Sequence, residues 1–100
     1  MYDLVNLKKM KTLKELAPEG MAGFLAFDAA AMKDGAIPAK YKELIALAVA
    51  FTTQCPYCID VHAKKAKQHG CTDAEIAEAG IVAAALRAGG AITHATHAIG

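Results

Sequence analysis

The sequence predicts an all-α fold of about five to six helices, in a single domain over residues 1–100. Its long segments favour alanine, leucine, lysine and glutamate, which are strong helix formers. No stretch alternates between apolar and polar residues with the period of two that a half-buried strand shows. Because alanine is so common, much of the apolar surface comes in methyl-sized pieces. We therefore expect an oligomer, in which other subunits complete the core.

The first two predicted elements are a helical arm and an alanine-rich helix. Residues 1–17 carry leucines spaced among lysines, as in a short amphipathic helix. Residues 18–20 are expected to interrupt the arm, and the second helix is predicted over residues 21–32. Gly35 follows, and glycine commonly ends a helix in a left-handed turn.

The motif-bearing core is predicted over residues 38–89, beginning with two helices. Pro38 is expected to open the third helix, because proline suits the first helical position. The body of that helix, residues 44–51, is apolar on every side, which predicts a helix buried all round. The fourth helix is predicted over residues 56–69, and Gly70 caps its end.

The C-terminal third predicts a capped fifth helix and a short sixth. Thr72 and Glu75 have the spacing of a capping box, which marks the start of the fifth helix. Gly89 and Gly90 are expected to break or bend it, since glycine disfavours a helix interior. Residues 91–99 are compatible with the sixth helix.

The stretch Cys55-Pro56-Tyr57-Cys58, followed by His62, holds the candidate reactive residues. Pro56 marks the first helical position, which makes Cys55 the N-cap and Cys58 the third helical residue. Two thiols at this spacing can form a disulfide within one turn. Cys58 is expected to have the lower pKa, because its thiol lies among unpaired N–H groups at the positive helix end. His62 follows one turn later on the same face.

Glu43 completes the candidate site as the last acidic residue before the apolar run. A carboxylate held there is partly withdrawn from water, which suits it to accept and donate protons. The alternative on local sequence alone is a water-exposed glutamate stabilised by the helix dipole.

The combined pattern of Glu43, eleven residues, Cys-x-x-Cys, three residues and His62 resembles the alkylhydroperoxidase D (AhpD) branch of the carboxymuconolactone decarboxylase family. The flanking stretches Leu-Ile-Ala-Leu-Ala-Val and Gly-Cys-Thr-Asp-Ala-Glu-Ile agree, and the resemblance covers residues 20–98. It implies an all-α fold assembled as trimers or hexamers, and a thiol-dependent peroxidase or disulfide reductase that acts in antioxidant defence. The decarboxylase branch lacks the cysteine pair, which disfavours decarboxylation here.

The resemblance also implies a role for each site residue. Cys58 attacks a hydroperoxide and becomes a sulfenic acid, and Cys55 resolves it by forming the Cys55–Cys58 disulfide. Glu43 and His62 relay protons. Well-known AhpD enzymes have a histidine directly before the second cysteine, where this chain has Tyr57, and tyrosine cannot replace a histidine base at neutral pH. The implied reductant is a lipoyl-bearing protein or a peroxiredoxin, and no bound cofactor is expected.

Three alternatives account for parts of the pattern. Cys-Pro-Tyr-Cys is also the glutaredoxin redox site, but there it follows a strand, and no strand pattern precedes it here. A non-enzymatic oligomerisation module could use its cysteines as core residues, as we expect for Cys71. His94 and His97 are interpreted as a polar helix face or subunit contact. The third alternative is a zinc site, whose ligands could be Cys55, Cys58 and His62 with His69, His94 or His97.

The net charge, the targeting signals and the cysteine count limit which partners and which compartment we expect. The net charge is +1, from eleven basic and ten acidic residues, so nothing suggests nucleic acid binding. The N-terminus has no secretory signal pattern, and residues 44–51 are far shorter than the ~20 residues of a bilayer span. Three cysteines with one close pair suit a reducing compartment. We expect a cytoplasmic protein that does not bind membranes.

Overall fold

The computed structural model describes residues 2–100, and every regular element in that range is a helix. This confirms the all-α prediction; Met1, the first residue of the expected arm, lies outside the described residues. The elements are η1 (Leu4–Lys9), α1 (Met10–Leu16), α2 (Pro18–Met32), α3 (Ala39–Thr53), α4 (Pro56–Gln68), α5 (Asp73–Ala95) and η2 (Thr96–Ala98).

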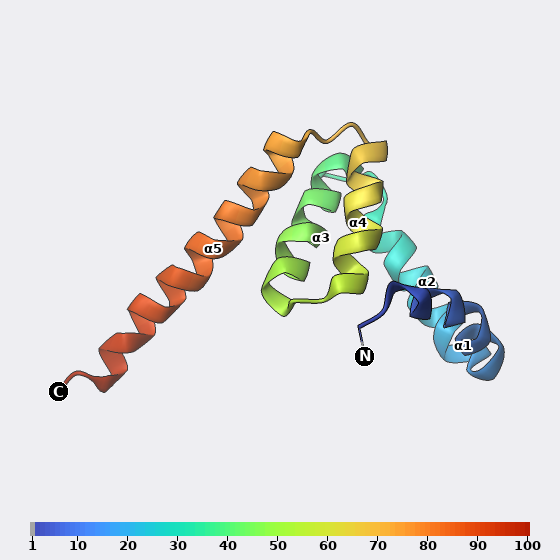
Figure 1. Cartoon of the computed structure of the whole chain (residues 1–100), viewed down its shortest axis with the longest axis horizontal. Helices are drawn as coiled ribbons and strands as arrows, with labels where there is room; N and C mark the ends of the chain where they lie inside the picture. Colours follow the sequence, from blue (N-terminus) through green and yellow to red (C-terminus); the bar gives the residue numbers. More distant parts are fainter. Residues whose placement is uncertain (1) are drawn as a thin grey trace.

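Helix α3 is the centre of the packing, with α4 along one side and the N-terminal half of α5 along the other (Figure 1). The core is small: Leu47 of α3 is fully buried and packs with Ala66 of α4 and with Cys71 from the α4–α5 connection. Helices α1 and α2 lie beyond α4, and η1 crosses near its N-terminal end (Figure 1). This arrangement places the start of α4 between α3 and the N-terminal arm.

Several helix boundaries follow from local sequence chemistry. Pro56 is the first residue of α4 and Cys55 is its N-cap, as predicted. Thr72 and Glu75 form the predicted capping box of α5, with both reciprocal hydrogen bonds present. Gly70 has a φ of +84°, the left-handed conformation expected at the end of α4.

Three predicted boundaries are wrong. Residues 18–20 do not separate the arm from the second helix. Pro18 is already the first residue of α2, because proline suits the first helical position there as well. Pro38 is the N-cap of α3 rather than its first residue, because α3 begins at Ala39. Helix α2 does end at Met32 as predicted, but with an extended C-cap at Lys33 in place of a left-handed glycine. Helix α5 continues unbroken through Gly89 and Gly90 to Ala95. Each glycine costs only about 1 kcal/mol relative to alanine, too little to break a long alanine-rich helix.

The apolar body of α3 is not buried all round. Leu47 and Ala50 face the core, but Ile45 and Val49 are 50% and 56% exposed. The radius of gyration is 16.6 Å, whereas a compact chain of this length has about 13 Å. The difference arises because the C-terminal half of α5 extends away from the other helices (Figure 1).

Within residues 2–100, one helical segment meets the length and hydropathy of a membrane span. Asp73–Ala98 has 26 residues and a mean hydropathy of 1.3, and only 6% of its apolar window is buried. A single such helix is weak evidence for membrane insertion, since core helices of soluble proteins have similar composition.

Candidate active site

A buried carboxylate–imidazole pair joins α3 to α4. Glu43 is 3% exposed, and its Oε2 lies 2.7 Å from Nδ1 of His62. The burial confirms that the carboxylate is withdrawn from water and contradicts the alternative of an exposed glutamate. An ionised carboxylate only accepts hydrogen bonds, so in the tautomer that fits this contact Nδ1 donates its hydrogen to Glu43. Nε2 is then the ring nitrogen that can exchange protons with the rest of the site.

The two cysteines of the motif lie in the first turn of α4 as free thiols. The backbone N–H of Cys58 donates to Sγ of Cys55 at 3.4 Å, which is the N-cap hydrogen bond of the helix. Cys55 is half-buried, whereas Cys58 is exposed. Cys58 is therefore the sulfur that solvent and small molecules reach more readily.

The acidity of the two thiols is opposite to the prediction that Cys58 has the lower pKa. The pKa of Cys55 is lowered because its sulfur accepts hydrogen bonds from the backbone N–H of Cys58, from the Cys58 thiol and from the backbone N–H of Tyr57. The pKa of Cys58 is raised, first because its thiol hydrogen-bonds Cys55, and then by burial and by the neighbouring Cys55 charge. The unpaired N–H groups at the helix start thus point at the N-cap sulfur rather than at the third helical residue.

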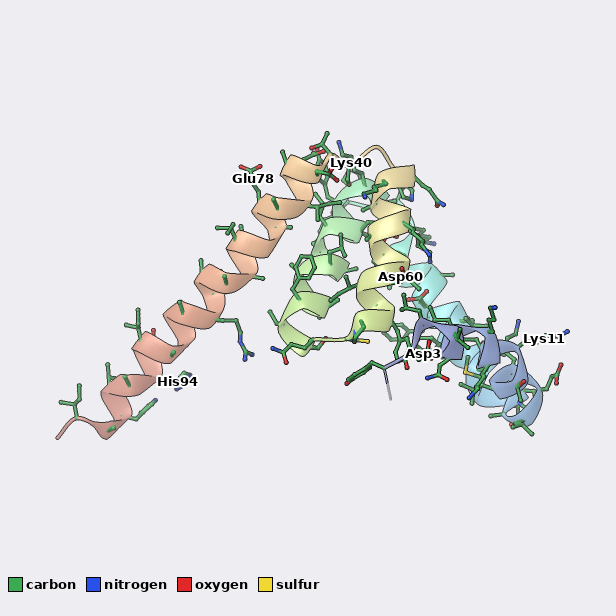
Figure 2. The ribbon with its side chains drawn as sticks, in the orientation of Figure 1. Asp3, Lys11, Lys40, Asp60, Glu78 and His94 are labelled. Atoms are coloured by element: carbon green, nitrogen blue, oxygen red, sulfur yellow. The ribbon has the colours of Figure 1, made fainter. Side chains whose placement is uncertain are left out.

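Tyr57 connects the turn that carries Cys55 and Cys58 to the N-terminal arm, a role that the sequence analysis did not predict. Its hydroxyl accepts a hydrogen bond from Nδ2 of Asn6 at 2.9 Å and one from the backbone N–H of Asp3 at 3.2 Å. The ring of Tyr2 contacts the Tyr57 ring at a centroid distance of 5.8 Å. Figure 2 shows Asp3 beside the start of α4. The only sequence signal for this role was a tyrosine where AhpD enzymes have histidine.

A cleft of about 390 Å³ opens beside Cys58 and His62. Its walls come from η1, α1, α2 and α4, and they are mostly apolar. Ligand pockets in proteins commonly enclose about 300–1,000 Å³, so the cleft is large enough for an organic molecule.

The other candidate residues do not join this site. Cys71 is buried and its thiol donates to the carbonyl of Lys40 at 3.6 Å, which fits the predicted structural role. The rings of His94 in α5 and His97 in η2 contact each other at a centroid distance of 5.2 Å. His94 lies near the C-terminal end of α5, far from α4 (Figure 2). Among residues 2–100, no group of three or more histidine, cysteine, aspartate or glutamate side chains could hold a metal ion.

The fold and site together define a class: a small all-helical protein with a Cys-x-x-Cys pair at a helix N-terminus beside a buried glutamate–histidine pair. The chain belongs to the carboxymuconolactone decarboxylase family, whose sequence profile matches residues 18–99. All four predicted site residues, Glu43, Cys55, Cys58 and His62, lie within that match.

Relatives of similar sequence and structure agree with this assignment. A Paracoccus denitrificans protein, named uncharacterized protein 4 in cox locus, is 42% identical over 99% of this chain and 92% of its own length. A Methanobacterium thermoautotrophicum crystal structure superimposes with a TM-score of 0.82 at 34% identity, covering 88% of this chain and 99% of that one. A carboxymuconolactone decarboxylase family protein from Legionella pneumophila has a TM-score of 0.77 at 36% identity, over 80% of this chain and 71% of its own.

Proposed function

We propose that this chain is an AhpD-like thiol-dependent peroxidase or disulfide reductase that serves in antioxidant defence. Cys55 and Cys58 cycle between dithiol and disulfide. The observation that carries the proposal is the 2.7 Å contact between buried Glu43 and His62, one helical turn from the sulfur pair. A helical assembly unit without chemistry has no need for a buried carboxylate–imidazole pair next to two thiols, one of which is exposed.

In the proposed peroxidase reaction, Cys58 is the attacking sulfur because it is the exposed thiol at the cleft. Its proton passes to Nε2 of His62, the ring nitrogen that does not face Glu43. The Cys58 thiolate attacks the distal oxygen of a hydroperoxide, so that an S–O bond forms and the O–O bond breaks. The departing alkoxide takes this same proton from Nε2 of His62, whose Nδ1 is hydrogen-bonded to Glu43.

The second step resolves the Cys58 sulfenic acid. Cys55 loses its proton and attacks the Cys58 sulfur, forming the S–S bond, and hydroxide leaves as water after taking a proton. The sum is one hydroperoxide and two thiols converted to one alcohol, one water and one disulfide. An external dithiol, carried by a lipoyl-bearing protein or a peroxiredoxin partner, then reduces the disulfide through a mixed-disulfide intermediate.

The size of the cleft favours organic hydroperoxides over hydrogen peroxide as the substrate. A water molecule occupies about 30 Å³ in the liquid, and hydrogen peroxide adds one oxygen atom to it. The cleft of about 390 Å³ is many times larger, and its apolar walls suit a hydrocarbon body.

A peroxide-consumption assay with dihydrolipoamide or dithiothreitol as reductant tests this function. Cys58→Ser and Cys55→Ser should abolish turnover, and Glu43→Gln and His62→Ala should lower it by about 10²–10⁴-fold, the usual contribution of general acid–base catalysis. Cys71→Ser is the matched control, because Cys71 lies outside the site. Equal activity of the wild type and the four site variants would refute the relay. One zinc per purified chain with unreactive thiols would support the metal-binding alternative instead.

We propose further that the chain is a cytoplasmic homo-oligomer, as a trimer or hexamer. The support is the extended shape together with large apolar side chains left exposed along α5, among them Ile81, Leu86 and Ile92. A reducing compartment would keep the free thiol pair available. Size-exclusion chromatography with light scattering tests the assembly, and a mass of one chain at micromolar concentration would contradict it.

A further inference from the structure

We propose that the N-terminal arm, residues 2–16, is a specificity-determining wall of the cleft that Tyr57 anchors to the redox turn. It makes the site prefer substrates with an extended apolar body over small polar peroxides. This inference rests on the proposed thiol chemistry, but it concerns a different part of the chain. The four residues to which we assign that chemistry all lie within the family match over residues 18–99, and the arm precedes it.

The anchor joins segments far apart in the sequence. Asn6 and Asp3 are 51 and 54 residues from Tyr57, and both donate hydrogen bonds to its hydroxyl. Tyr2 adds a ring contact to the same side chain. Because Tyr57 lies between Cys55 and Cys58, these contacts hold the arm directly over the turn that carries both sulfurs.

The arm supplies the apolar wall that faces α4 across the cleft. Leu7 of η1 and Met10 of α1 line the cleft opposite Val61, and Phe24 of α2 adds an aromatic side chain. Met10 is 39% exposed, so it offers apolar surface to a ligand rather than to the core. Methionine is flexible and polarisable, which suits it to contact hydrocarbon bodies of varied shape.

Leu7 and Met10 line the same cleft as Cys58 and His62, and without the arm that apolar lining would be lost. The reaction at sulfur does not require those two side chains. Binding of an apolar substrate does depend on them, because burial against them removes the apolar surface of the substrate from water. Loosening the anchor should therefore change which peroxide is preferred more than it changes the reaction itself.

The test compares the kcat/KM values for cumene hydroperoxide and hydrogen peroxide. Tyr57→Phe removes the anchoring hydroxyl, and Met10→Ala trims the wall while leaving the anchor intact. Each should reduce the cumene-to-hydrogen-peroxide ratio by about tenfold, within the discrimination typical of small changes in apolar pockets, chiefly through a higher KM for cumene hydroperoxide. Tyr41→Phe on α3 is the matched control and should leave the ratio unchanged. An unchanged ratio in both variants, or an equal loss for both peroxides, overturns the proposal.

A labelling experiment separates failure of this inference from failure of the proposed function. A wild type that consumes neither peroxide refutes the peroxidase assignment. The proposed preference of the arm for apolar molecules is then tested by alkylation of Cys58. N-phenylmaleimide is apolar and iodoacetamide is small and polar. The ratio of their labelling rates at Cys58, followed by peptide mass spectrometry, should fall by about tenfold in Tyr57→Phe and Met10→Ala if the arm binds apolar bodies. Equal ratios in the wild type and both variants reject the inference.

Discussion

Replacing His62 with alanine should destabilise the chain more than replacing Glu43 with glutamine. The Glu43 side chain is 4% exposed, and its partner atom, Nδ1 of His62, is 2.7 Å away. Alanine at position 62 leaves the buried carboxylate without that partner, and breaking a buried pair in this way costs about 3–5 kcal/mol. Because the His62 side chain is itself 17% exposed, water can reach part of the space it leaves. We therefore expect the lower end of the range, about 3 kcal/mol.

Glu43→Gln keeps the shape of the side chain and one acceptor oxygen, so it should cost only about 1 kcal/mol, the net value of one hydrogen bond. For a domain of this size, 1 kcal/mol shifts the Tm by roughly 4–8 °C. His62→Ala should then lower the Tm by about 12–24 °C. His69→Ala is the matched control, because His69 is an exposed histidine at the C-cap of the same helix and should change stability by less than about 0.5 kcal/mol.

Urea denaturation followed by circular dichroism measures these differences, at one protein concentration because association adds to the apparent stability. A cost for His62→Ala below that of Glu43→Gln would refute the reasoning.

Three further predictions concern α4 and its neighbouring caps. Cys55 should be alkylated by iodoacetamide at lower pH than Cys58, because its lowered pKa keeps thiolate present where Cys58, with its raised pKa, is still protonated. Peptide mass spectrometry between about pH 5 and 9 checks the order, and earlier labelling of Cys58 would contradict the N-cap argument. Gln54→Gly should raise stability by about 1 kcal/mol, since Gln54 holds a left-handed φ of 56°, and an unchanged or lower Tm would count against it. Thr72→Ala should lower stability by about 1 kcal/mol by removing the 3.1 Å bond to the Glu75 N–H, whereas serine there should retain most of it.

Features that depend on a few neighbouring residues could be predicted well. Pro56 and Cys55 define the start of α4, and Thr72 with Glu75 defines the start of α5. These signals work because a cap is made by a side chain and a backbone group within three residues of each other. The prediction failed at Gly89, where a small local preference was outweighed by the surrounding alanine-rich helix.

Exposure was harder to predict, because it depends on what covers a residue rather than on the residue itself. The apolar run of α3 indicated full burial, yet Ile45 and Val49 are half exposed, since α4 and α5 cover only part of the helix surface. Cys58 lies in the first turn of a packed helix but is exposed, because a cleft opens between it and the N-terminal arm.

The amino-acid sequence by itself determined that the chain is helical, where α4 and α5 begin, and that two sulfurs share one helical turn, because each of these depends on interactions within about one turn. Only the tertiary structure decided that Glu43 meets His62 across 19 residues and that Tyr57 holds an arm 51 residues away. It also decided which thiol is the more acidic. Contacts of that kind come from helix packing and the direction of individual N–H groups, which residue spacing along the chain does not specify.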